Sequence, residues 1–142
     1  MHIYQIEQVN DEMVAAFGRL LPQLSQKAKS ITKEALEEII SSNNTLLIAA
    51  DHGDSKPVAT LTIVFYRTPT TLRARIEDVV VDKDSRGKGI GQALIRYAID
   101  KAKQAGCAGV DLTSRPDRTQ ANRLYQKIGF NSVKTNVYRF PL

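Results

Sequence analysis

The sequence predicts a mixed α/β fold in which one sheet is covered by helices. Residues 46–81 alternate β-rich segments with short polar turns, which indicates an antiparallel meander. Residues 89–112 read as a helix followed by a strand, the pattern of a parallel crossover. The 142 residues are 42% hydrophobic and 25% charged, so we expect a single globular domain over residues 1–142.

The first half of the chain predicts a strand, two helices and then the meander. Residues 2–9 favour a strand, and Asn10 or Asp11 can cap a helix whose apolar residues recur at helical spacing over 13–21. Thr32 precedes a second helical pattern, which stops at Asn43 and Asn44. The meander strands are expected at residues 46–50, 58–66 and 74–81.

The second half alternates helices with strands. A helix over residues 89–104 ends at Gly106, and a strand over 107–112 follows. A helix over 119–128 stops at Gly129, and two late strands are expected at 130–133 and 135–140. The expected sheet therefore has six or seven strands, antiparallel at first and parallel or split towards its end.

Charge and cysteine content narrow the classes of partner and site. The net charge of +5 favours an anionic partner without choosing among a phosphate-bearing ligand, a nucleic acid and a membrane. The single cysteine, Cys107, excludes an internal disulfide and a multi-cysteine metal site, and we expect no metal. The sequence shows no signal-peptide pattern and no apolar stretch long enough to span a bilayer, so we expect a cytoplasmic protein without a membrane partner.

The most informative segment is a hydrophobic strand that runs through a basic, glycine-rich turn into a helix. The turn reads Arg86-Gly87-Lys88-Gly89-Ile90-Gly91. Glycines let backbone N–H groups approach a ligand, and a helix N-terminus adds unpaired donors and partial positive charge. This combination suits a phosphate or pyrophosphate. The Walker pattern is absent, and the G-x-G-x-G spacing differs from the G-x-G-x-x-G of dinucleotide-binding folds.

The same turn resembles the phosphate loop of the GNAT family of acetyl-CoA-dependent N-acetyltransferases, [QR]-x-x-G-x-[GA]. The preceding Ile-Glu-Asp-Val-Val-Val, residues 76–81, is similar to the family's fourth strand. A second family segment follows at residues 121–130, with Asn122, Tyr125 and the Gly129-Phe130 pair in their usual order. The order of expected elements also matches, so the resemblance spans nearly the whole chain.

The resemblance implies helices on both faces of the sheet, a splayed pair of fourth and fifth strands, and acetyl-CoA as cosubstrate. It implies that the strand backbone pairs with the pantetheine arm, that the turn holds the pyrophosphate, and that Asn122 contacts the pantetheine or only the helix. The implied coenzyme residues are Val79, Val80, Val81, Arg86, Gly87, Lys88, Gly89, Ile90, Gly91, Asn122 and Tyr125.

Two side chains are the expected catalytic groups. Tyr125 matches the family's usual general acid, which protonates the leaving thiolate; a phenol has a pKa of ~10 and a thiol of ~8.5. Alternatively, Tyr125 is only a packed helix residue. Glu77 is the expected acceptor of the amine proton, directly or through water, or else a structural carboxylate. Asp78 points to the opposite face in a regular strand, and a bulge would exchange the two faces.

The resemblance implies direct transfer of acetyl from acetyl-CoA to a primary amine of an unidentified small molecule, peptide or protein lysine. The alternative is a non-catalytic acyl-CoA-binding regulatory module on the same fold. A small basic nucleic-acid binder is the third reading, but only 6% of the residues are aromatic, and we expect no nucleic-acid partner. Homodimers are common in the family, although no interface is evident in this sequence.

Overall fold

The computed structural model describes residues 1–142. The chain forms two compact units, Met1–Leu112 and Thr113–Leu142. The elements of the first unit are β1 (His2–Gln5), α1 (Asp11–Leu24), α2 (Lys33–Ser41), β2 (Thr45–Asp51), β3 (Ala59–Arg67), β4 (Leu72–Val81), the short 3-10 helix η1 (Lys83–Ser85), α3 (Ile90–Gln104) and β5 (Val110–Asp111). The second unit holds α4 (Thr119–Ile128).

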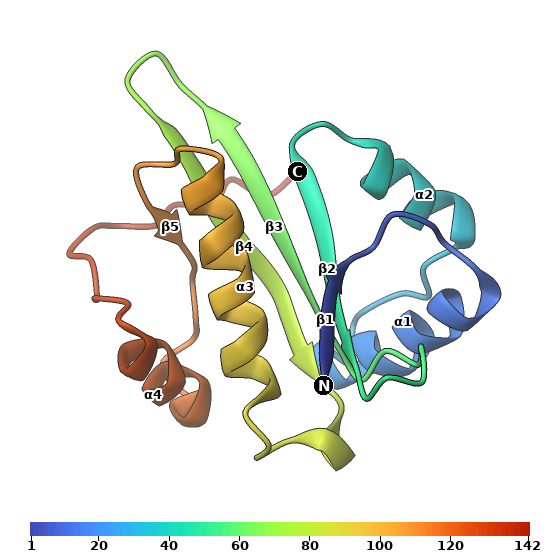
Figure 1. Ribbon diagram of the computed structural model, residues 1–142. Helices are drawn as coiled ribbons and strands as arrows, with labels where there is room; N and C mark the ends of the chain where they lie inside the picture. Colours follow the sequence, from blue (N-terminus) through green and yellow to red (C-terminus); the bar gives the residue numbers. More distant parts are fainter. The chain divides into compact units, whose positions relative to one another are not determined.

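The first unit is built on one five-stranded sheet in the order β1-β2-β3-β4-β5 (Figure 1). The first three pairings are antiparallel, and β4 pairs with β5 in parallel. Helix α3 makes the connection between these two parallel strands. The mixed sheet with a helical crossover at its end, predicted from the sequence, is therefore confirmed.

Helices cover both faces of this sheet. Helix α1 packs on β4 and α2 on β2, while α3 packs on β2, β3 and β4. Leu47 belongs to a cluster with Phe17 of α1 and Leu36 of α2. Side chains alternate along a strand, so the neighbouring Ile48 faces the other side, which α3 covers (Figure 1). These two apolar layers hold the sheet between the helices.

Both expected N-caps of the first two helices form. The side chain of Asn10 accepts a hydrogen bond from the N–H of Met13 at 2.9 Å, and the hydroxyl of Thr32 accepts one from Ala35 at 3.1 Å. Each cap satisfies a donor that the first helical turn leaves unpaired. No helix in the structure combines the length and the apolarity that crossing a membrane requires.

The number of strands corrects one expectation. The sheet has five strands, and the two late strands expected at 130–133 and 135–140 do not form. Residues 131–142 are exposed throughout, including Val137 at 74% and Phe140 at 86%. An apolar pattern makes a strand only where a partner takes up its backbone groups and buries its side chains, and this segment has neither.

Candidate active site

Strand β4 extends well beyond the end of its partner β5. The parallel ladder has only two residue pairs, Ala74 with Val110 and Arg75 with Asp111. Strand β4 then continues to Val81, and we call the side of residues 76–81 that faces away from β3 the open β4 edge. A strand edge without a neighbour presents backbone N–H and C=O groups in a row, which an extended ligand can pair with. The expected separation of the fourth and fifth strands is present in this geometry.

A β-bulge interrupts β4 within this edge. Thr62 pairs with Glu77 and Thr60 pairs with Val80, so Leu61 of β3 stands opposite two residues, Asp78 and Val79. Asp78 has a φ of 52°, a left-handed conformation that L-residues other than asparagine and aspartate rarely adopt. The extra residue shifts the alternation of every later side chain by one position.

The direction of the β4 amides follows from two hydrogen bonds. The N–H of Asp82 donates to the carbonyl of Val58 on the β3 side at 2.8 Å. Because backbone groups alternate in direction along a strand, those of Val81 and Val79 lie on the open β4 edge. The carbonyl of Val81 accepts a hydrogen bond from Nε of Arg86 at 3.0 Å, which agrees with this direction.

Glu77 is held by a neighbour on its own strand. Its Oε1 accepts a charge-assisted hydrogen bond from Nε of Arg75, and both side chains are roughly two-fifths exposed, at 43% and 40%. Residues two apart lie on the same face of a strand, which explains the pairing. The face is the one that carries Thr62 of β3, the residue paired with Glu77. The sequence analysis did not anticipate this ion pair.

Beyond the bulge, the chain is anchored to α1. Nε of Arg19 donates to Oδ2 of Asp82 at 2.9 Å, and Nη2 of Arg19 donates to the carbonyl of Pro57 at 2.6 Å. The hydrogen bond from Arg19 holds the pKa of the Asp82 carboxyl below its usual range. Asp82 also accepts hydrogen bonds from Asp84 and Ser85, so it fixes the start of the turn that follows β4.

The glycine-rich turn has the backbone shape of an anion site. Gly87 and Gly89 have φ values of 76° and 78°. A Cβ placed on either glycine would meet no atom within 4 Å, so the space beside the backbone is open. Gly89 is the N-cap of α3 and provides no side-chain cap. The first N–H groups of α3 thus lack a protein acceptor and are available to an anion.

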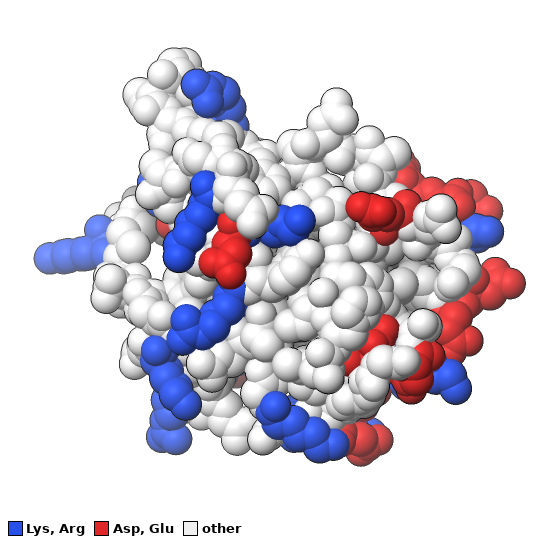
Figure 2. Space-filling view, in the orientation of Figure 1, with Lys and Arg blue, Asp and Glu red and all other residues white.

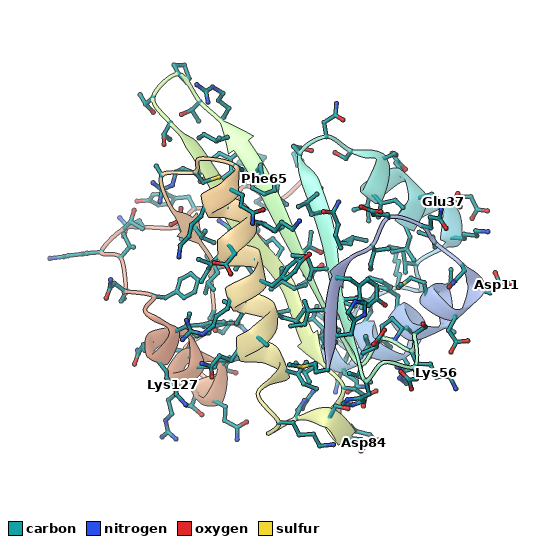
Figure 3. The ribbon with its side chains drawn as sticks, viewed as in Figure 1. Asp11, Glu37, Lys56, Phe65, Asp84 and Lys127 are labelled. Carbon is teal, nitrogen blue, oxygen red and sulfur yellow. The ribbon has the colours of Figure 1, made fainter.

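Positive charge stands at the same turn. Nε of Arg86 donates to the carbonyl of Val81, and Nζ of Lys88 lies 3.4 Å from the carbonyl of Asp84 (labelled in Figure 3). Carboxylates gather elsewhere on the first unit, over the side that α1 and α2 occupy (Figure 2). The exposed acids of that side are Glu7, Asp11, Glu12, Glu34, Glu37 and Glu38.

The remaining expected site residues belong to the second unit. Nδ2 of Asn122 donates to the carbonyl of Arg115 at 3.1 Å and ties the preceding loop to α4. Tyr125 is buried and its ring meets Phe130 edge-on at 6.0 Å between centroids. Burial raises the pKa of the Tyr125 phenol, and Arg118 opposes this. The hydroxyl therefore stays protonated at neutral pH.

The first unit alone brings together Glu77, the Val79–Val81 backbone and the Arg86–Gly91 turn, because β4 leads into α3 through η1. Sequence reasoning missed the partners Arg75 and Arg19. An Arg-x-Glu spacing within a strand was a signal for the first. The second, 63 positions from Asp82, had no local signal.

Comparisons with known proteins show which family this chain resembles. The model of the acetyltransferase (GNAT) family matches residues 6–130. Glucosamine 6-phosphate N-acetyltransferase 1 of Oryza sativa subsp. japonica is 32% identical over 130 residues, which cover 85% of this chain and 75% of the rice protein. The [ribosomal protein bS18]-alanine N-acetyltransferase of Escherichia coli is 33% identical over 67 residues, 46% of this chain and 45% of that protein.

Solved structures show the same fold. A putative acetyltransferase from Agrobacterium tumefaciens superposes with a TM-score of 0.87 at 22% identity, over 99% of this chain and 100% of its own. The family match over most of the chain, together with the open β4 edge and the glycine turn, leads to one conclusion: this chain belongs to the GNAT family of acetyltransferases.

Proposed function

We propose that this protein is an N-acetyltransferase that moves the acetyl group of acetyl-CoA directly to a primary amine. The observation that carries the proposal is the continuity of the open β4 edge with the glycine turn. A single stretch of backbone, residues 76–91, offers strand groups for an extended amide chain and then a helix N-terminus for a pyrophosphate. Pantetheine pyrophosphate has these two chemistries in this order.

The turn residues fit the coenzyme. The open space at Gly87 and Gly89 lets phosphate oxygens reach the backbone N–H groups of residues 86–91. The charges of Arg86 and Lys88 strengthen this binding. Along the open β4 edge, the backbone of Val79, Val80 and Val81 takes the pantetheine amides, and the N–H of Val79 polarises the thioester carbonyl. Asn122 and Tyr125 complete the proposed coenzyme contacts.

The bound coenzyme supplies an activated acetyl group. Two proton transfers accompany the reaction, one to the leaving thiolate and one from the acceptor ammonium. The family likeness gives Tyr125 the role of general acid for the leaving thiolate, and a phenol kept protonated by burial is suited to it. The acceptor ammonium must lose a proton before it can attack. Two adjacent carboxylates, Glu77 and Asp78, lie in this part of β4 and could accept that proton. Glu77 is the candidate that the sequence indicates.

Amino-sugar phosphates are the first acceptor class to test, because the rice relative that aligns over most of this chain is named for glucosamine 6-phosphate. A peptide N-terminal alanine comes second, since the bacterial relative aligns over a shorter stretch. The assay is thiol release from acetyl-CoA across glucosamine 6-phosphate, glucosamine, an alanine-ending peptide and a lysine peptide. Glucosamine separates the contribution of the phosphate from that of the sugar amine.

Coenzyme binding is measured separately from turnover. Acetyl-CoA at about 100 times its Kd should stabilise the fold by about 2.7 kcal/mol, and pantetheine, without the phosphates, much less. A stabilised protein that releases no thiol with any amine would support the alternative, a non-catalytic acyl-CoA-binding module. The absence of any stabilisation would overturn the proposal itself.

A further inference from the structure

The two adjacent carboxylates at the bulge, Glu77 and Asp78, differ in their hydrogen bonding. Glu77 lies in the regular part of β4, and its Oε1 is already occupied by Nε of Arg75. Glu77 thus already serves as a hydrogen-bond acceptor within the protein. Asp78, one residue later, accepts no hydrogen bond and forms no ion pair within the protein. Of the two groups, Asp78 is the one whose oxygens are ready to receive a proton.

The backbone at Asp78 is an outlier at the same place. Its φ of 52° occurs in the middle of a strand, whereas the other non-glycine residue with positive φ, Ser55, lies in the turn between β2 and β3. Among residues with a side chain, aspartate and asparagine adopt this left-handed conformation most readily, and it is rare within a strand. Strained backbone held within a regular element is characteristic of functional sites. A bulge is also the device that re-aims a side chain along a strand.

The surroundings contain little charge that acts on Asp78. The bulge faces Thr60, Leu61 and Thr62 of β3, none of which titrates near neutral pH. The buried faces of α1 and α3 are apolar. On neighbouring elements, Arg19 contacts Asp82, Arg73 contacts Asp111, and Lys101 contacts the ring of Tyr97. Asp78 is exposed, and a partial loss of hydration, followed by the Glu77 carboxylate, raises its pKa.

We propose that Asp78, and not Glu77, takes the proton of the acceptor ammonium, while the Arg75–Glu77 pair holds the strand beside it. The inference rests on the proposed acetyl transfer. The ammonium gives one proton to the Asp78 carboxylate, which later passes it to water. The neutral amine then attacks, the N–C bond forms and the C–S bond of acetyl-CoA breaks. The second amine proton ends on the leaving sulfur, so acetamide, free thiol and one proton are the products.

The test compares Asp78→Asn with Glu77→Gln. Asparagine tolerates the left-handed conformation, so Asp78→Asn removes the charge and keeps the bulge. The kcat/KM for glucosamine 6-phosphate, or for the best acceptor of the panel, is measured between pH 5.5 and about 9.5. Asp78→Asn should lower kcat/KM by 10²–10⁴-fold at pH 7. The loss should shrink as the pH approaches the pKa of the amine, because a neutral amine needs no base.

Glu77→Gln should lose less than about tenfold across this pH range, since it removes a supporting ion pair and no proton acceptor. Asp78→Gly is the backbone control: it relieves the positive φ, so it should melt no earlier than the parent protein yet be as inactive as Asp78→Asn. Melting curves with and without acetyl-CoA show that each variant folds and binds the coenzyme.

Only one pattern supports the assignment: Asp78→Asn shows a large loss that shrinks towards the pKa of the amine, and Glu77→Gln loses less than about tenfold. Any other pattern in an active parent protein overturns it and leaves the proposed function standing. Wild-type activity in Asp78→Gly overturns it as well. A parent protein that releases no thiol with any acceptor overturns the proposed function, and this is seen before any variant is made.

Discussion

Arg19 in α1 reaches Asp82 at the end of β4, with 2.9 Å between Nε and Oδ2, across 63 positions of sequence. The bulge makes this contact possible. Without the extra residue at Asp78, the alternation of side chains would direct Asp82 to the other face of the sheet, which α3 covers. The irregularity in β4 and the anchoring of the glycine turn are therefore one structural feature.

Removal of this anchor should lower stability. We expect Arg19→Ala to lose about 1–2 kcal/mol in urea unfolding at pH 7, because it breaks a charge-assisted bond to a nearly buried carboxylate. Half of the Arg19 side chain is hydrated, which keeps the loss at the lower end of the range for such bonds. Arg96→Ala, on the exposed side of α3, is the matched control and should change stability by less than about 0.5 kcal/mol.

The same pair has a defined pH dependence. The pKa of Asp82 is lowered in the folded protein relative to about 3.9 in an unfolded chain. A lowered folded-state pKa means that the stabilisation is complete above about pH 4 and is lost as the pH falls through the folded value. The difference between the parent protein and Arg19→Ala should thus shrink below pH 4. A difference that grows towards acid pH would contradict this assignment.

The two ends of α3 offer a matched pair of glycines for testing the coenzyme turn. Gly89 and Gly106 have φ values of 78° and 79°, and a Cβ on either would meet no atom within 4 Å. Alanine at each position should therefore produce a similar fall in Tm, from backbone strain of about 1–2 kcal/mol. Only Gly89→Ala should also lose the stabilisation by acetyl-CoA, because its Cβ stands where the pyrophosphate approaches. Equal responses to acetyl-CoA would exclude this turn as the phosphate site.

Tyr125→Phe removes a hydroxyl and keeps the edge-on contact with Phe130. If the phenol protonates the thiolate, kcat and kcat/KM should fall together by 10²–10⁴-fold with little change in Tm. Tyr97→Phe, which retains the ring under Lys101, should keep full activity. A Tyr125→Phe protein with most of its kcat would show that the thiolate leaves unaided, and one that melts early would indicate a packing role.

The short β4–β5 ladder should be the weak point of the sheet. Arg73 closes it by donating to both carboxylate oxygens of Asp111, at 3.1 and 3.2 Å. Arg73→Ala should change the overall stability little, because the pair is partly exposed. Amide exchange at Ala74 and Ala108, which donate across this ladder, should nevertheless accelerate. Exchange at Phe65, which donates to Asn44 on the other side of β3, should not change.

Local patterns in the sequence determined most elements and the family. The helix over 119–128 was predicted with the bounds that α4 has, and the caps at Asn10 and Thr32 followed from nearest-neighbour chemistry. The run from Glu77 to Gly91 predicted the glycine turn as a candidate anion site, because glycine conformation and helix N-termini act over a few residues. The bulge was anticipated as one possibility for Glu77 and Asp78, without its consequence for later residues.

Tertiary structure alone decided what depends on distant partners. The segments 130–133 and 135–140 carry strand-like patterns, yet no strand forms, since pairing is not encoded within one segment. Arg19 could not be assigned to Asp82 before the register of β3 and β4 was known. The same register separates Glu77, engaged by Arg75, from the unpaired Asp78. The sequence thus determined which groups lie along this strand, and the sheet decided which of them are paired, because a one-residue shift of register changes the neighbours of every side chain beyond it.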